Sequence, residues 1–169
     1  MRYIYCFLIL FLICSCAKDK ATNAKRVDIY LLKSFSATIN QTTKPVTHTI
    51  ANAILADTPF VSNNEIRYYN KATYTFRLDA NVKEKIKDYG PDKAFAVAVD
   101  GQPVYYGVFH PAYMSSLVYG LAYIDPIVLT TNNSLTIAYI GDGSATLQNL
   151  DHRNSNELLD AFKTSKRLR

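Results

Sequence analysis

The stretch AFAVAVDGQPVYYGVF, residues 94–109, decides the fold that this sequence predicts. An Asp-Gly pair separates two runs rich in β-branched and aromatic residues. This pattern is typical of a type I′ hairpin, because glycine accepts a positive φ without steric cost. In the first run, Phe95, Val97 and Val99 share one face and three alanines share the other. Since small side chains permit close approach, we expect a helix to cover the alanine face.

Further strands are predicted on both sides of this hairpin. Apolar residues alternate with others in residues 27–33, residues 67–78 (strand, turn, strand) and residues 134–140. Residues 49–56 are compatible with a strand or a helical turn, and residues 126–129 with a short strand. Residues 34–48 are rich in Thr, Ser, Asn and Gln, so we expect a loop or an exposed hairpin there.

A first helix is predicted over residues 80–89, with Asp79 as its N-cap. Its apolar residues Val82, Ile86 and Tyr89 recur at the spacing of one helix face. A Gly-Pro pair follows and ends the helix, because proline cannot continue it.

A second, amphipathic helix is predicted over residues 156–168, with Leu158 and Phe162 facing inward. Asn154 and Glu157 have the spacing of a capping box. Strands dominate and about two helices interrupt them. The predicted fold class is therefore α+β, with a mainly antiparallel sheet.

The first sixteen residues predict a lipoprotein signal. Arg2 is followed by an apolar run over residues 4–13, which is too short for a membrane span. The run leads into Ile-Cys-Ser-Cys, a lipobox whose last residue, Cys16, takes the lipid. Acyl chains there anchor the protein to a membrane. The alternatives are an ordinary signal peptide cut elsewhere and an uncleaved N-terminal anchor.

The predicted organisation has three parts. Residues 1–15 are the signal peptide, residues 16–26 are the lipidated cysteine and a flexible polar tether, and residues 27–169 are a single α+β domain. Ala17 follows the lipidated cysteine, where enteric bacteria place aspartate to retain a lipoprotein at the inner membrane. The outer membrane of a bacterial envelope is therefore favoured over the inner one.

Composition excludes several classes of function. The three cysteines all lie within the first sixteen residues, so the domain has no disulfide and no thiolate site. We expect no cofactor and no metal. The net charge is +5, but an exported domain is not expected to bind nucleic acid. A basic cluster (Lys163, Lys166, Arg167, Arg169) is either a solvated helix end or a surface for anionic lipid headgroups.

Catalytic and metal-binding patterns are weak. A hydrolase would use His110 as base with Ser115 or Ser116, although neither serine lies in a Gly-x-Ser-x-Gly elbow. The supporting acid would be Asp125 or Asp100. For a hard cation, Asp142 followed by Asp151 and His152 is the candidate, without the spacing of a calcium loop.

Tyrosines suggest a surface for a partner instead. The sequence has 13 tyrosines, and five of them lie between residues 105 and 123. Tyrosine offers a large amphipathic contact area at low entropic cost. Core packing explains most of these rings, but a contact surface is predicted at Tyr106, Phe109 and Tyr113. An envelope protein, a peptide or a glycan fits such a surface.

Two stretches resemble known families. Residues 61–89 followed by residues 95–109 are similar to the base of the first periplasmic domain of SecD, a subunit of the bacterial protein-export complex. The pattern V-D-G-x-x-x-Y-x-G-x-F in residues 99–109, with an Asp-x-Arg step at residues 151–153, resembles uncharacterised bacterial lipoproteins. The resemblance implies a ferredoxin-like α+β unit. It also leaves an accessory role in protein export or assembly as an alternative to a non-catalytic binding or structural module.

Overall fold

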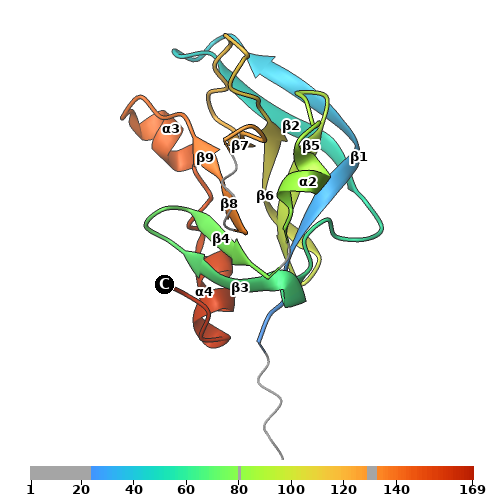
Figure 1. Cartoon of the computed structure of the whole chain (residues 1–169). Helices are drawn as coiled ribbons and strands as arrows, with labels where there is room; N and C mark the ends of the chain where they lie inside the picture. The colour runs from blue at the N-terminus through green and yellow to red at the C-terminus, as the bar shows by residue number, and fades with distance from the viewer. Residues whose placement is uncertain (1–23, 80, 129–132) are drawn as a thin grey trace, which may run out of the picture.

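A computed structural model describes residues 24–79, 81–128 and 133–169 (Figure 1). The predicted signal peptide, Cys16 and most of the predicted tether lie outside these residues. The described chain is α+β, with mainly antiparallel sheets and three α-helices. This confirms the predicted fold class.

The described strands form two sheets. The larger has six strands in the order β2-β1-β5-β6-β7-β9, and the smaller has the order β3-β4-β8. The strands are β1 (Val27–Asn40), β2 (Thr47–Leu55), β3 (Ile66–Asn70), β4 (Thr75–Leu78), β5 (Ala94–Val99), β6 (Gln102–Phe109), β7 (Ala122–Ile124), β8 (Ser134–Thr136) and β9 (Ala138–Tyr139). The helices are the 3-10 turn η1 (Asn63–Glu65), α2 (Lys83–Ile86), α3 (Ala145–Leu150) and α4 (Asn156–Thr164). A ferredoxin-like unit consists of two βαβ halves in succession. The order of helices and strands along this chain does not confirm such a unit.

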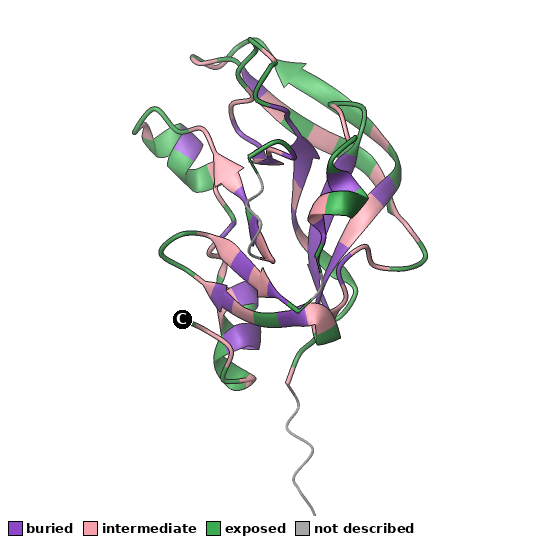
Figure 2. Cartoon of the chain, viewed as in Figure 1, coloured by how far each residue is buried: buried purple, intermediate pink, exposed green. Residues whose placement is uncertain are grey.

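The predicted hairpin of β5 and β6 lies in the middle of the larger sheet. Asp100 and Gly101 form its two-residue loop with φ of 50° and 77°, as a type I′ turn requires. In β6, Gly107 allows close packing, because a Cβ there would lie 2.6 Å from the carbonyl oxygen of Ala122 and clash with the ring of Phe95. Every residue of β5 is buried (Figure 2).

The alanine face of β5 is not covered by a helix. Ala94 and Ala96 pack with residues of β1, β2 and β6 and with residues 118–123. The larger sheet is curled, so that its β2 end approaches the segment before β7. There the His48 N–H donates to the carbonyl of Tyr119 at 2.7 Å. The prediction was wrong because a curled sheet can cover its own face.

The opposite face of β5 joins the main core. Phe95, Val97 and Val99 belong to it, together with residues from the smaller sheet and α4. Its aromatic centre is Tyr69, whose ring lies 4.7 Å from that of Phe76 and 5.3 Å from that of Phe162.

Several boundaries differ from the predicted ones. Among the described residues 81–89, α2 is a single helical turn, and Asp79 pairs with Arg67 instead of capping a helix. The N-cap of α4 is Ser155, one residue after the predicted cap. Residues 126–128 form a turn instead of a strand. The predicted strand over residues 134–140 divides into β8 and β9, which lie in different sheets.

The two N-terminal segments for which the sequence left alternatives, residues 34–48 and residues 49–56, are mostly strand. Residues 34–40 and β2 form an exposed ribbon, so the exposed-hairpin alternative is confirmed there and the helical turn at residues 49–56 is not formed. The predicted second helix extends to residue 168, but α4 ends at Thr164, so residues 167–169 are not helical. They extend the smaller sheet, where Leu168 forms a parallel bridge with Tyr69.

Candidate functional site

The candidate site is a cavity along the part of the β6 edge with which no other described strand pairs. Pairing between β6 and β7 covers only Gly107–Phe109, matched to Ala122–Ile124. The three preceding residues, Val104, Tyr105 and Tyr106, all line one cavity of about 180 Å³. Successive side chains of a strand point to opposite faces. Three consecutive residues share a cavity only where that cavity runs along the strand edge.

The other walls of this cavity come from four separate segments. They are β2 (Thr49, Ile50), residues 120–122, β9 (Tyr139) and the end of α3 with the turn after it (Leu150, Asp151, His152). The curl of the larger sheet brings β2 to this place, and α3 closes the opposite side. The lining is mostly apolar and aromatic, with a carboxylate and an imidazole at one end.

A second hollow continues the first along the same strand. It measures about 520 Å³ and shares Val104 and His152 with the first cavity. Its remaining lining residues are Lys25, Val99, Asp100, Gln102, Pro103, Ser155 and Glu157. The two hollows together follow β6 from the hairpin turn to Tyr106.

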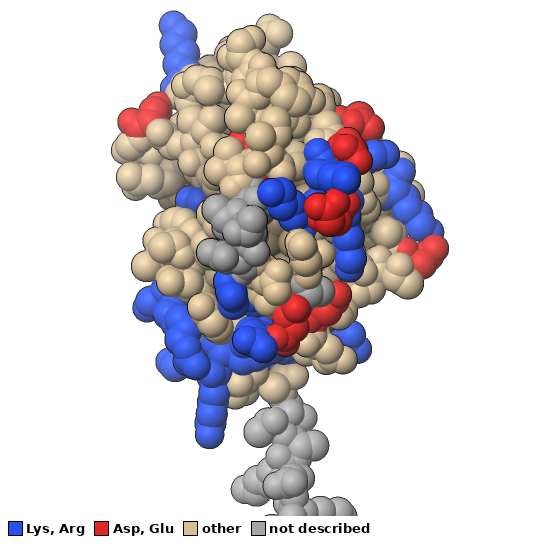
Figure 3. Space-filling model, viewed as in Figure 1, with Lys and Arg blue, Asp and Glu red and all other residues tan. Residues whose placement is uncertain are grey.

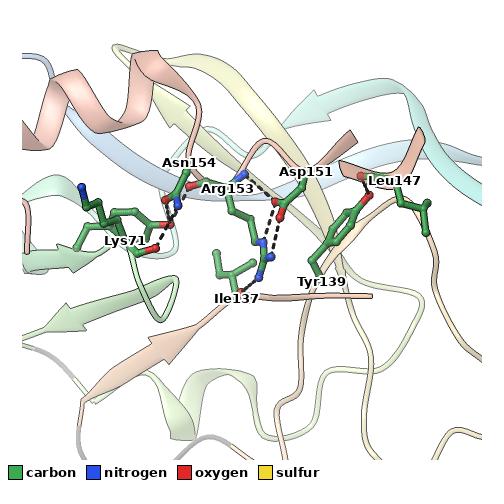
Figure 4. A network of polar contacts seen from close by, with 8 residues as sticks. Lys71, Ile137, Tyr139, Leu147, Asp151, Arg153 and Asn154 are labelled. Atoms are coloured by element: carbon green, nitrogen blue, oxygen red, sulfur yellow. Dashed lines mark hydrogen bonds and ion pairs between the residues drawn. The ribbon is translucent and has the colours of Figure 1, made fainter. Parts of the chain in front are cut away.

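An ion pair between buried Arg153 and half-buried Asp151 fixes the polar wall of the site (Figure 4). Arg153 donates from Nε and Nη2 to the two carboxylate oxygens of Asp151, at 2.8 and 2.7 Å. Its Nη1 donates to the carbonyl of Ile137 at 2.9 Å, and its guanidinium lies 3.6 Å from the ring centroid of Tyr74. Burial favours the neutral form of Asp151, but the hydrogen bonds from Arg153 outweigh it and hold the pKa of Asp151 below its ordinary value.

Two tyrosines of the lining are held neutral by burial. The Tyr139 hydroxyl donates to the carbonyl of Leu147 at 2.6 Å, and burial raises the pKa of Tyr139 to about 12. Tyr105 is 5% exposed, and burial raises the pKa of its hydroxyl as well. Within the described chain this hydroxyl has no hydrogen-bond partner. A buried hydroxyl of this kind is a candidate partner for an internal water molecule.

The structure separates the three residues of the predicted contact surface. Tyr106 lines the β6 cavity, and Tyr113 lies in the loop after β6 with 74% of its surface exposed. Phe109 is wrong as a surface residue, because it is fully buried and its ring makes edge contacts with Phe60, Tyr89 and Phe95. The parallel pairing with β7 draws this end of β6 into the core, and the sequence carries no local signal for that pairing.

The proposed catalytic residues make other contacts. His110 Nε2 lies 2.9 Å from the backbone carbonyl oxygen of Ser116. Because a carbonyl only accepts, this nitrogen carries the proton and cannot take one from a serine. Asp125 accepts the N–H of Ile127, and Asp100 accepts the N–H of Arg26.

The candidate cation ligands are also engaged. Asp142 accepts the N–H of Ser144 at 2.8 Å, and Asp151 is paired with Arg153. Over residues 24–79, 81–128 and 133–169, no group of three or more His, Cys, Asp or Glu side chains could hold a metal ion.

Comparisons of the chain with protein-family models, with curated proteins and with solved structures give no match. The resemblance to SecD and to bacterial lipoproteins therefore rests on the quoted residues alone. In the part of the chain that the structure describes, no helix has the length and apolar character that a membrane span needs.

Proposed function

We propose that this protein is a lipid-anchored bacterial envelope protein whose folded domain is a non-catalytic binding module. Residues 1–15 are removed as a signal peptide, Cys16 carries the acyl chains, and residues 16–26 tether the domain. The lipobox and the polar segment after it support the anchor. The domain then lies in the periplasm or at the cell surface, with the outer membrane favoured.

The ligand we propose is an extended peptide segment that adds to the open edge of β6. The observation that carries this proposal is the run Val104–Tyr106, which lines the cavity before pairing with β7 begins. An exposed strand edge offers unpaired N–H and C=O groups, and peptides bind such edges by strand addition. The tyrosine rings beside the edge supply contact area for side chains.

The dimensions of the groove suit this ligand. Residues 102–106 of β6 extend over about 17 Å, since a strand rises roughly 3.3 Å per residue. A peptide of about five residues spans that length. The Asp151 carboxylate offers a polar partner at the inner end, and Glu157 offers one at the outer end.

A displayed library of random peptides, selected against the full-length protein, tests the proposal. Enriched peptides should slow hydrogen exchange at those amides of Gln102 and Val104–Tyr106 that point away from β5, since Pro103 has no amide hydrogen. Tyr106→Ala should weaken their binding about ten-fold or more, since tyrosine is a frequent hot-spot residue. Tyr113→Ala, the same change at an exposed ring outside the cavity, should leave binding unchanged.

Two results would count against this ligand. One is a selection that enriches no peptide. The other is a bound peptide that protects amides elsewhere, or whose affinity depends on Tyr113 and not on Tyr106.

A further inference from the structure

A basic hollow lies between α4 and the C-terminal strand segment. It measures about 610 Å³, and four of its lining residues are cationic: Lys71, Lys163, Lys166 and Arg169. Leu159 and Leu168 contribute apolar surface, and Asp160 contributes one negative charge. Figure 3 shows Lys and Arg side chains gathered at the lower left of the molecule, over this end.

The four cationic side chains are available to an external anion. Each of them is exposed, and no ion pair among the described residues involves them. Elsewhere on the surface, Lys33, Lys85 and Lys87 are paired with carboxylates. The hollow therefore holds an excess of positive charge, with four cationic side chains against the one carboxylate of Asp160.

This basic end is also the end at which the chain enters the domain. The N–H of Val27, the first residue of β1, donates to Asn63 Oδ1 at 3.0 Å. Arg167, beside the hollow, donates to the same oxygen at 2.7 Å. In Figure 1, β1 starts beside β3 and α4, and its 14 residues run away from them to the distant β1–β2 turn.

We propose that the basic hollow of α4 and the C-terminal segment docks the domain onto anionic lipid headgroups of the bilayer that holds Cys16. This inference rests on the proposed lipid anchor. Val27 follows Cys16 by eleven residues, so the tether reaches at most about 36–40 Å and keeps this end near the membrane. Lys or Arg near an anionic bilayer strengthens attachment about five-fold per charge, within a Debye length of about 8 Å.

Docking by this end fixes an orientation with consequences for the proposed binding site. The exposed β1–β2 ribbon, with Lys44 in its turn, points away from the bilayer. The β6 groove begins at this entry end, where Lys25 lines it, and runs to Tyr106, so its outer part would lie nearer the bilayer than its inner part. A free tether without docking would leave every face equally accessible to solvent reagents.

Lysine footprinting of the lipidated full-length protein tests the docking. The protein is reconstituted into nanodiscs of phosphatidylcholine alone or with added phosphatidylglycerol, and a water-soluble acetylating reagent labels its amines. Mass spectrometry then gives the labelling rate of each lysine. In the anionic nanodiscs we expect the rates of Lys71, Lys163 and Lys166 to fall about five-fold or more, with Lys44 unchanged.

Matched charge variants separate docking from a general effect of charge. K163Q/K166Q should abolish the protection of Lys71, whereas K33Q/K44Q removes the same charge from positions outside the hollow and should leave it intact. Equal labelling of wild-type protein in both nanodiscs would overturn the proposal and point to a soluble anionic partner instead. Protein that carries no acyl chain, seen by intact mass, would instead refute the anchor on which the docking rests.

Discussion

Val27 and Arg167 meet at one oxygen atom, since the backbone N–H of one and the Nη2 of the other both donate to Oδ1 of Asn63. Arg167 also donates from Nη1 to the carbonyls of Asn63 and Ile66. One amide side chain thus ties the start of β1 to the C-terminal strand segment. This junction holds the entry point of the chain against the basic hollow.

Asn63→Ala should loosen both ends of the domain together. The change leaves the partly buried donors of Val27 and Arg167 without an acceptor, at a cost of about 1–3 kcal/mol in the free energy of unfolding. Denaturant unfolding measures the cost, and hydrogen exchange should speed up at Val27 and Arg169. Asn64→Ala, at the exposed neighbouring residue, should change neither quantity. Faster exchange at only one end would contradict the junction.

Arg153→Ala should be among the most damaging single changes. It leaves the half-buried Asp151 carboxylate and the Ile137 carbonyl without their donor, which costs about 3 kcal/mol in the free energy of unfolding. Arg153→Lys should recover only part of this, because lysine lacks the fork that binds both carboxylate oxygens. The control is Arg67→Ala at an exposed pair with Asp79, where the expected cost is below about 1 kcal/mol. Similar losses in the free energy of unfolding for Arg153→Ala and Arg67→Ala would contradict the stabilising role assigned to Arg153.

Gly107→Ala should destabilise the sheet by about 1–3 kcal/mol. Its new Cβ would press on the Phe95 ring and on the carbonyl of Ala122, both inside the core. Gly141→Ala is the matched control, because its Cβ would lie 3.9 Å from Tyr139, an ordinary contact. Thermal unfolding distinguishes the two, and equal midpoints would show that β6 and β7 do not approach so closely.

Alkaline unfolding should begin with buried phenols. Burial raises the pKa of Tyr69, Tyr105 and Tyr139 above the ordinary value of about 10. Because the pKa of these groups is higher in the folded than in the unfolded protein, their contribution to stability is complete below about pH 10. It is lost as the pH rises through the folded-state pKa. Circular dichroism should therefore change together with the part of the tyrosinate absorbance that comes from these three rings, between about pH 10 and 12. Complete tyrosine ionisation with an unchanged circular-dichroism spectrum would contradict this.

The central hairpin and the inward faces of α2 and α4 were predictable because their signals are local. An Asp-Gly pair sets the turn between β5 and β6, and apolar spacing marks Ile86 and Phe162 as buried. The helix α3 was missed, although Ser144 before it is an N-cap residue. Its six residues are too few for a periodic pattern to stand out.

The candidate site could not be predicted, because non-local pairing builds it. The β6 edge is open only because β7 pairs in parallel from Gly107 onward, after a connection without a regular pattern. The curl that brings Ile50 to Tyr106 depends on irregular register in β1. The sequence did indicate Tyr106, through its tyrosine-rich surroundings. It could not distinguish that ring from buried Phe109.

The acyl anchor at Cys16 is the central claim, and the intact mass of the protein purified from native envelopes tests it most directly. The account predicts a chain that begins at Cys16 and carries diacylglyceryl and acyl groups. Cys14→Ser should leave that mass shift in place, and Cys16→Ser should abolish it. A wild-type chain that retains residues 1–15, or that begins elsewhere without lipid, would contradict the account.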